Sequence, residues 1–326
     1  MIRTWKRRLQ EVLCPARDRQ FPQSFLEATV TGMRFPQLWP AGAARVDSDG
    51  TITRSAEHGE SKHHKPEHRE PEHPADSPIP VILIHGTWMN AFNTWSYLAP
   101  RLADTGRDVY TFTYGKDTSS LAGLIRGVCG NGDLEDSYQQ VCAAIETVMA
   151  HTGANYVDLV AHSQGAMHAR RIAHQFNDQT NSGSGSSQHV RRLVSITGNH
   201  QGTTATGLGT FVAVCRKVKL PIDVIAHRLL GAGAIGQLTD GPYFQNLNMC
   251  AGSFALSRPE IDYLNIATSG DYIVTPWDSA LMPETTGHKI KNIKLPENYP
   301  GVAVSHLSVL FHQEVSRIVV SFLSED

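Results

Sequence analysis

The stretch DLVAHSQGAMHARRIA, residues 158–173, decides the fold of this chain. Apolar residues run up to Val160, the residues Ala-His-Ser-Gln-Gly follow, and a helical pattern comes after them. A serine at such a corner between a buried strand and a helix has two interpretations. It is an ordinary turn residue, or it is a nucleophile held at the tip of the strand, with backbone N–H groups at the positive end of the next helix beside it.

Strand and helix patterns alternate on both sides of this corner. Continuous β-branched runs such as PVILIHG (80–86) are typical of strands buried on both faces, as in parallel sheets. Apolar residues at helical spacing predict a helix over 134–153, and the chain closes with a second helix over 305–323. Further strands are expected at 107–114, 156–162, 190–198, 260–270 and 288–295. The predicted fold class is α/β, with a mostly parallel central sheet flanked by helices.

Size and composition set broad limits. The chain has 326 residues, of which 40% are hydrophobic, and this is enough for a large core. A net charge of −2 gives no reason to expect a nucleic-acid partner. The five cysteines show neither a CxxC pair nor a metal-finger spacing. A bridge between Cys215 and Cys250 is conceivable, but small buried thiols are the preferred interpretation.

The first 78 residues differ in composition from the rest. We expect an N-terminal extension over 1–52 and a disordered linker over 53–78, where His, Glu and Pro replace apolar residues. Metal binding by the linker histidines is the weaker alternative, because nothing fixes their geometry. The basic N-terminus lacks the apolar run of a signal peptide. Its apolar face over 2–13 fits a short packed helix better than a segment lying on a membrane.

The corner serine carries a resemblance to a known family. Ala161 and Gly165 place small residues two positions on either side of Ser163, so the pattern resembles the G-x-S-x-G nucleophile elbow of the α/β-hydrolase superfamily, with alanine in the first position. VILIHGTWMN (81–90) resembles the His-Gly oxyanion loop of lipases and esterases. With these two motifs and NTWSYLAPRLADTG (93–106), the chain resembles the class 2 family of bacterial triacylglycerol lipases over roughly residues 79–323.

This resemblance implies roles for particular residues. Ser163 would be the nucleophile, Asp271 in NIATSGDYIVTP the triad carboxylate, and His306 in GVAVSHLSVLF the base. The backbone N–H groups of Thr87 and Gln164 would form the oxyanion hole. The residues expected around the pocket are His85, which holds the loop, Gly86, Trp88, His162, Asn199 and His200.

Other residues of the same types fit the expected order less well. Asp262 lies inside a strand, and Asp278 lies beyond the loop. His288 opens a strand, and His312 is expected two turns inside the final helix. His200 follows a strand too, but the resemblance gives its Asn-His-Gly-Thr stretch no triad role; Asn199 and His200 are expected to shape the pocket floor. The inserted Gln201 departs from that stretch.

The resemblance implies an α/β-hydrolase domain over 79–326 with an inserted helical cap over about 203–258. The leading hypothesis is a serine ester hydrolase, a lipase or carboxylesterase that works through an acyl-enzyme. The alternatives are an acyltransferase with the same triad and a non-catalytic α/β-hydrolase-like binding protein. We expect an acyl ester or lipid as substrate and no cofactor, metal or nucleic acid. Contact with a lipid surface, oligomeric state and location stay open, with a lean to the cytoplasm.

Overall fold

The computed structural model describes residues 22–35, 38–54, 79–177, 189–206, 222–238, 243 and 256–325. Several predictions fall outside these residues. They are the segment at 2–13, the linker apart from Thr53 and Arg54, much of the cap range, and the Cys215–Cys250 pair.

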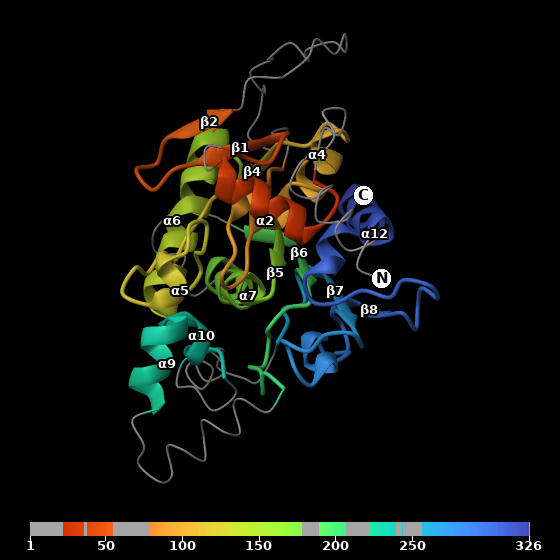
Figure 1. Cartoon of the computed structure of the whole chain (residues 1–326). Coiled ribbons are helices and arrows are strands. Elements are labelled where there is room, and N and C mark those ends of the chain that lie inside the picture. Colours follow the sequence, from red (N-terminus) through yellow and green to blue (C-terminus); the bar gives the residue numbers. More distant parts are fainter. Residues whose placement is uncertain are drawn as a thin grey trace, which may run out of the picture.

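An eight-stranded sheet with the order β2-β1-β4-β3-β5-β6-β7-β8 forms the centre of the molecule (Figure 1). Every neighbouring pair is parallel except β1 with β2. The predicted α/β class with a mostly parallel sheet is therefore confirmed. The strands are β1 (Ala43–Val46), β2 (Ile52–Arg54), β3 (Val81–Ile84), β4 (Val109–Thr111), β5 (Tyr156–His162), β6 (His189–Ile196), β7 (Asp262–Thr268) and β8 (Lys289–Leu295).

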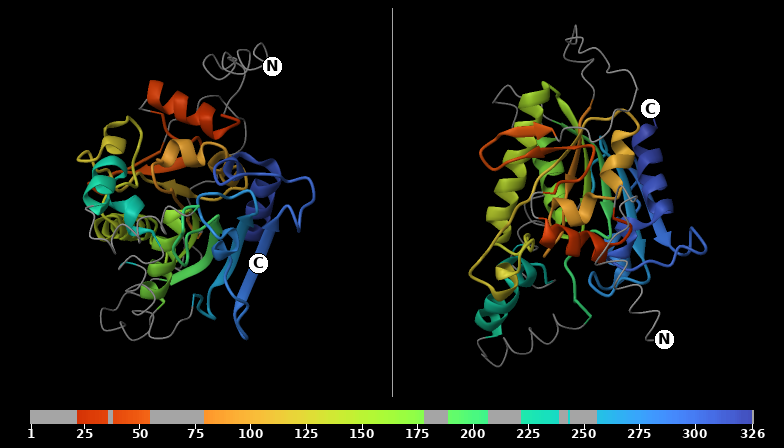
Figure 2. Two further views of the ribbon diagram at one scale, coloured as in Figure 1. Left: turned by 60° about the horizontal axis from the view of Figure 1, so that its bottom comes forward. Right: turned by 45° about the horizontal axis from the view of Figure 1, so that its top comes forward.

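Helices cover both faces of this sheet (Figure 2). Alternate residues of β3 point into two separate cores: Val81 and Leu83 into one, Ile82 and Ile84 into the other. The first core is closed by α2 (Phe25–Arg34), α3 (Ala91–Trp95), α4 (Leu98–Ala103) and α12 (Gln313–Ser324). The second is closed by α6 (Leu134–Thr152) and α7 (Gln164–Phe176). The period of two along each strand thus sorts the apolar side chains between two layers of helices.

Helix α6 forms for local reasons that the sequence already displays. The Asp133 side chain accepts hydrogen bonds from the backbone N–H groups of Glu135 and Asp136, which caps the first turn. Gly153 ends the helix in the left-handed conformation. The seven apolar residues predicted to form one face are all buried: Leu134, Tyr138, Val141, Cys142, Ile145, Val148 and Met149.

The N-terminal boundary of the α/β unit needs a correction. β1 pairs with β4 in parallel, and β2 pairs with β1. Residues 43–54 are thus part of the sheet rather than of a separate extension, and Thr53 and Arg54 belong to β2 rather than to the linker. These strands could not be recognised from hydrophobic periodicity because each has only three or four residues.

The predicted closing helix over 305–323 is also corrected. Residues 308–311 form the short 3-10 helix η4 (Ser308–Phe311), and α12 begins only at Gln313. The His312 side chain caps α12 by accepting a hydrogen bond from the backbone N–H of Glu314 at 3.2 Å. His306 therefore lies in a loop before both helices. None of the described helices is long and apolar enough to cross a membrane.

A buried carboxylate ties the amino ends of the central strands together. Asp158 of β5 is fully buried. It accepts hydrogen bonds from Arg107, just before β4, at 3.0 Å, and from Arg191 of β6 at 2.6 and 3.0 Å. Two guanidinium groups thus compensate one desolvated charge at the end of the sheet opposite to Ser163.

Replacing this carboxylate should destabilise the fold. Asp158→Asn leaves two partly buried arginines without their counter-charge, so we expect the free energy of unfolding in urea to fall by about 3 kcal/mol. Asp262→Asn is the matched control, because Asp262 pairs with the exposed Lys289 at 3.1 Å, and its loss should cost less than about 1 kcal/mol. Equal losses in the two variants would contradict this assignment.

Candidate active site

Ser163 occupies a strained corner between β5 and α7. Its backbone angles are φ 53° and ψ −121°, a region that residues other than glycine rarely adopt. The corner is held by hydrogen bonds from the Ser163 N–H to the Ile196 carbonyl at 3.2 Å and from the Asn199 N–H to the Ser163 carbonyl at 3.1 Å. The side chain is placed at the carboxyl edge of the parallel sheet, where loops from several strands meet.

The residues around the corner must be small because neighbouring atoms leave no room for larger side chains. A Cβ on Gly165 would lie 2.5 Å from the Ile84 carbonyl oxygen, and a Cβ on Gly86 would lie 2.9 Å from the Ser163 Cβ. Both distances are too short for a side chain. Ala161, in the position of the first glycine of the motif, is fully buried in β5, so an alanine is accommodated there.

The structure brings together the three residues predicted to form the triad, although they come from three separate loops. The Nε2 atom of His306 lies 3.0 Å from the Ser163 Oγ. The His306 Nδ1–H donates a hydrogen bond to Asp271 Oδ2 at 2.7 Å. Asp271 follows β7 and His306 follows β8, and all three residues are no more than 5% exposed.

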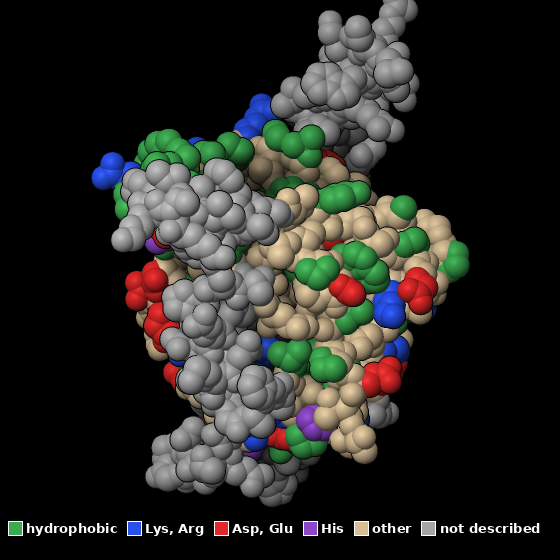
Figure 3. Space-filling view, turned by 90° about the horizontal axis from the view of Figure 1, so that it is seen from below, with side chains coloured by type: hydrophobic (Ala, Val, Ile, Leu, Met, Phe, Trp, Pro, Cys, Tyr) green, Lys and Arg blue, Asp and Glu red, His purple; other side chains and the backbone are tan. Residues whose placement is uncertain are grey.

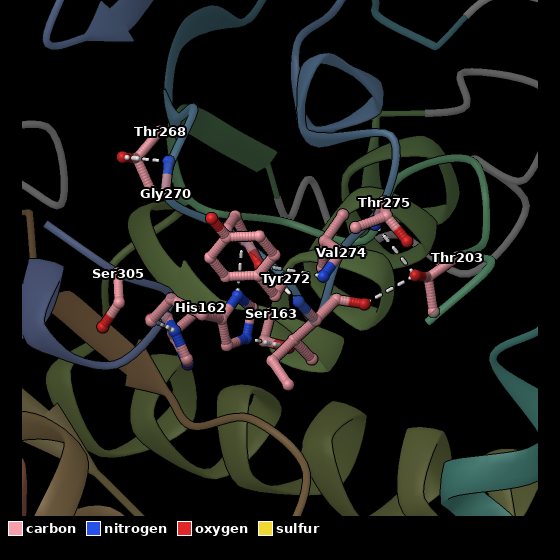
Figure 4. Close-up of polar contacts among 12 residues, drawn as sticks. His162, Ser163, Thr203, Thr268, Gly270, Tyr272, Val274, Thr275 and Ser305 are labelled. Atoms are coloured by element: carbon pink, nitrogen blue, oxygen red, sulfur yellow. Dashed lines mark hydrogen bonds and ion pairs between the residues drawn. The ribbon is translucent and has the colours of Figure 1, made fainter. Parts of the chain in front are cut away.

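Asp271 is fixed by backbone donors as well as by the imidazole. Its Oδ1 accepts hydrogen bonds from the N–H groups of Ile273 at 2.8 Å and Val274 at 3.0 Å. Since Oδ1 is held in this way, Oδ2 is directed at His306. Figure 4 shows the surroundings, with Ser163, His162 and Val274 labelled. A carboxylate can only accept, so His306 carries its proton on Nδ1 and presents the lone pair of Nε2 to the serine hydroxyl.

The rival residues lie elsewhere. Asp262 opens β7, at the opposite end of the sheet from Ser163, and Asp278 lies in the 3-10 helix η3 (Trp277–Ala280). His288 bonds to Ser257 at 2.8 Å. His312 is the cap of α12 and not a residue two turns inside a helix, which corrects that expectation.

The loop after β3 is held by His85. Its Nδ1–H donates to the Gly86 carbonyl at 2.8 Å, and its Nε2 accepts from the Tyr114 N–H at 3.2 Å. The imidazole also stacks on the Tyr114 ring with 4.2 Å between centroids. Burial lowers the pKa of His85 to about 4, so the ring stays neutral and can accept from Tyr114.

The two predicted oxyanion donors are Gln164, which directly follows Ser163, and Thr87, which follows Gly86 in the loop after β3. Gln164 is the first residue of α7, so its N–H has no partner within the helix. Its side-chain oxygen lies 3.2 Å from the Tyr114 hydroxyl. The Thr87 hydroxyl accepts a hydrogen bond from Gln237 Nε2 at 2.7 Å. Gln237 could not be predicted from the sequence, because it lies in the cap range and belongs to no motif.

The His162 ring contacts both the backbone and the ring of His306. Its Nε2–H donates to the His306 carbonyl oxygen at 2.9 Å, and the two ring centroids are 4.8 Å apart. Burial, followed by the neighbouring His306, holds the pKa of His162 well below its usual value. His200 is fully buried, and its carbonyl accepts from Arg170 at 2.9 Å. Gln201, the inserted residue, is exposed.

The described parts of the cap range adjoin the site. They include the helices α9 (Ile222–Leu230) and α10 (Ala232–Gly236), which lie next to α5 (Leu121–Leu124) and α6 (Figure 1). The Trp88 indole N–H donates to the Leu230 carbonyl at 2.8 Å. This bond joins the loop after β3 to the end of α9.

Residues 78–227 match the family model described as Lipase (class 2). Over this segment the chain resembles the class 2 lipases. The elbow, the loop after β3 and the start of α9 all fall inside the matched segment, whereas Asp271 and His306 lie outside it. No curated protein matches the chain in sequence.

Solved lipase structures show that the chain has the α/β-hydrolase fold, at low sequence identity. Lipase B of Aspergillus fumigatus is 16% identical with a TM-score of 0.52, over 78% of this chain and 54% of that chain. The match thus spans just over half the length of the fungal protein. The mature lipase BlEst2 of Bacillus licheniformis is 13% identical (TM-score 0.50, 78% of this chain and 95% of that one). A structure from a study of metagenome-derived lipolytic enzymes is 15% identical with a TM-score of 0.52, over 76% of this chain and 94% of that chain.

We expect buried histidines to make the stability of this fold depend on pH. His168 of α7 is fully buried, and burial, followed by the charge of Arg171, lowers its pKa to about 3. Burial likewise lowers the pKa of His200 to about 3. The unfolded chain binds protons on such groups below pH 6.5, while the folded chain does not, so the fold loses stability as the pH falls through this window.

We expect His168→Gln to reduce this pH dependence. Between pH 7.5 and pH 5, His168 alone should cost the wild-type fold about 2 kcal/mol, because only the unfolded state becomes protonated. Urea unfolding at both pH values measures the difference. The exposed His151 provides the control, and His151→Gln should leave the pH dependence unchanged. A slope in His168→Gln equal to that of the wild type would contradict the prediction.

Proposed function

We propose that this α/β-hydrolase is a lipolytic serine ester hydrolase, a lipase or carboxylesterase. The observation that carries the proposal is the placement of the His306 imidazole between the Ser163 hydroxyl and the Asp271 carboxylate, at 3.0 and 2.7 Å. The match of residues 78–227 to the class 2 lipase family supports a substrate of the acyl ester or lipid class.

In the proposed acylation step, Ser163 Oγ attacks the ester carbonyl while His306 Nε2 takes its proton. Asp271 keeps the imidazole oriented and stabilises its charged form. The negative charge that develops on the carbonyl oxygen would be bound by the N–H groups of Thr87 and Gln164. His306 then gives its proton to the leaving alcohol, and the acyl group stays on Ser163.

Water completes the cycle. His306 takes a proton from a water molecule, which attacks the acyl-enzyme and releases the acid while the proton returns to Ser163 Oγ. The neutral state of His162 supports this chemistry, because a second positive charge 4.8 Å from His306 would oppose imidazolium formation. The residues of the chain provide every proton transfer in this scheme.

An apolar surface beside the site favours a lipid substrate. Six large side chains on or next to α5 and α9 are at least 47% exposed: Leu121, Leu124, Ile125, Val224, Ile225 and Leu229. The two helices lie against each other, and α9 is joined to the loop after β3 through Trp88. Figure 3 shows this end of the molecule, where hydrophobic side chains reach the surface. Exposed apolar groups of this kind mark contact with another apolar phase, and we propose that this α5–α9 surface rests on the lipid that holds the substrate.

Removing the nucleophile should abolish turnover. We expect Ser163→Ala to lower kcat for p-nitrophenyl butyrate by about a million-fold, the size of the effect when the nucleophile of another serine triad is removed. Ser324→Ala, at the end of α12, is the control and should keep full activity. Hydrolysis by Ser163→Ala at a rate near that of the wild type would refute the proposed mechanism.

Analysis of the reaction products distinguishes hydrolysis from acyl transfer. With added short alcohols, a hydrolase should still release mostly free acid, whereas an acyltransferase would form the new ester as its main product. A folded wild-type protein without any esterase activity would favour the non-catalytic alternative.

Charges on the α5–α9 surface should impair lipid hydrolysis selectively. The double variant Leu124→Asp/Ile225→Asp places two charges against the lipid, so we expect at least about a tenfold loss of activity on emulsified triolein. Activity on soluble p-nitrophenyl acetate should stay within about twofold of the wild type, because the triad is untouched. Tyr156→Asp is the control: Tyr156 is 47% exposed but opens β5, at the opposite end from Ser163. Equal losses on both substrates would contradict the surface role.

A further inference from the structure

Two loops are joined by threonines next to the site. We call Thr203, Thr204, Thr206 and Thr275 the threonine cluster. The first three follow β6 and lead into the cap range, whereas Thr275 belongs to the turn that follows Asp271. Thr204 bonds to Thr275 through its N–H at 2.9 Å and its hydroxyl at 2.8 Å, and the Thr206 N–H donates to the Thr275 hydroxyl at 2.9 Å.

The hydroxyl of Thr203 makes three hydrogen bonds within these two loops. It donates to the Ile273 carbonyl oxygen at 2.6 Å and accepts from the N–H groups of Thr275 at 3.0 Å and Ala205 at 2.9 Å. One donor and two acceptor sites are all that a hydroxyl offers, so every one of them is used. The residue is only 7% exposed, and water has little access to replace it.

A single peptide unit connects this hydroxyl to Asp271. The carbonyl of Ile273 and the N–H of Val274 belong to one planar peptide group and point in opposite directions. The carbonyl end is bound by Thr203, and the N–H end donates to Asp271 Oδ1 at 3.0 Å. Fixing the carbonyl therefore fixes the direction of the donor that holds Asp271. Figure 4 labels Thr203, Val274 and Thr275 in this region.

We propose that Thr203 is a positioning residue for the triad, which acts through the Ile273–Val274 peptide to aim the Asp271 carboxylate at His306. This inference rests on the proposed function of the triad. With Oδ1 held by the N–H groups of Ile273 and Val274, only Oδ2 faces the imidazole. Without the Thr203 hydroxyl, the peptide can rotate, the carboxylate loses a directed donor, and the imidazole loses its fixed orientation.

The same residue also connects to the other side of the site. The Thr203 N–H donates to the Gln237 carbonyl at 3.1 Å, and the Gln237 side chain donates to the Thr87 hydroxyl. Thr203 thus lies between the loop that carries the acid and the loop proposed to bind the oxyanion. Its backbone contacts do not depend on the side chain, so a change of side chain alone tests the hydroxyl.

The experiment compares two substitutions at this position. Thr203→Val keeps the branched shape but removes the hydroxyl, and we expect kcat for p-nitrophenyl butyrate to fall about 10- to 100-fold through misplacement of Asp271. The KM should change by less than about threefold, because Thr203 is not proposed to touch substrate. Thr203→Ser keeps the hydroxyl and should restore kcat to within about threefold of the wild type.

Two controls make the role of Asp271 testable. Thr204→Val removes a hydroxyl of the same cluster that does not bind the Ile273–Val274 peptide, and kcat should stay within about threefold of the wild type. In an Asp271→Asn background, Thr203→Val should cause little further loss, since residues that act as one unit are not additive.

The outcomes separate this inference from the proposed function. Wild-type kcat in Thr203→Val, failure of Thr203→Ser to restore it, or a full additional loss in the Asp271→Asn background would each overturn the positioning role. A wild-type protein that hydrolyses no ester would instead overturn the proposed function. A fall in kcat with rescue by serine and no additivity would support the inference.

Discussion

The sharp corner at Ser163 is the constraint on which the rest of the site depends. A serine at φ 53° is held only where its surroundings overdetermine the backbone, and here the loop after β3 and the segment after β6 both do so. Gly86 and Gly165 allow the β3 loop to approach within contact of the corner. Hydrogen bonds with Ile196 and Asn199 hold it from the other side. The strain thus places one hydroxyl at the carboxyl edge of the sheet, ahead of the first turn of α7.

The other loops of that edge are arranged around this corner. Parallel strands bring the segments after β3, β7 and β8 to the same side of the sheet, so residues far apart in sequence meet. Each functional group there has its own support: His162 and Asp271 hold His306, the turn after Asp271 holds the carboxylate, and Thr203 holds that turn. The buried imidazoles of His85 and His162 are neutral, so they add no charge beside the predicted triad.

How far the sequence predicted this arrangement depends on whether a feature is local. The elbow and α6 could be recognised because their small residues, caps and apolar spacing lie in one short window. Asp271 and His306 could be selected because the resembled family places its acid and then its histidine after the nucleophile, and few residues of these types lie at the ends of predicted strands. β1 and β2 could not be recognised, since three or four residues carry no periodicity and the pairing of β1 with β4 is long-range. Gln237 and Thr203 could not be predicted for a similar reason: each is connected to the site through side-chain contacts with residues 150 and 70 positions away.

The most direct test of the account is to find which atom reacts. The purified wild-type protein is treated with a fluorophosphonate, digested and examined by mass spectrometry. We predict one phosphonyl adduct, on Ser163, and a much slower reaction in His306→Asn because the hydroxyl then lacks its base. A folded, unlabelled protein, or an adduct on a serine elsewhere in the chain, would contradict the central claim that this corner holds the nucleophile.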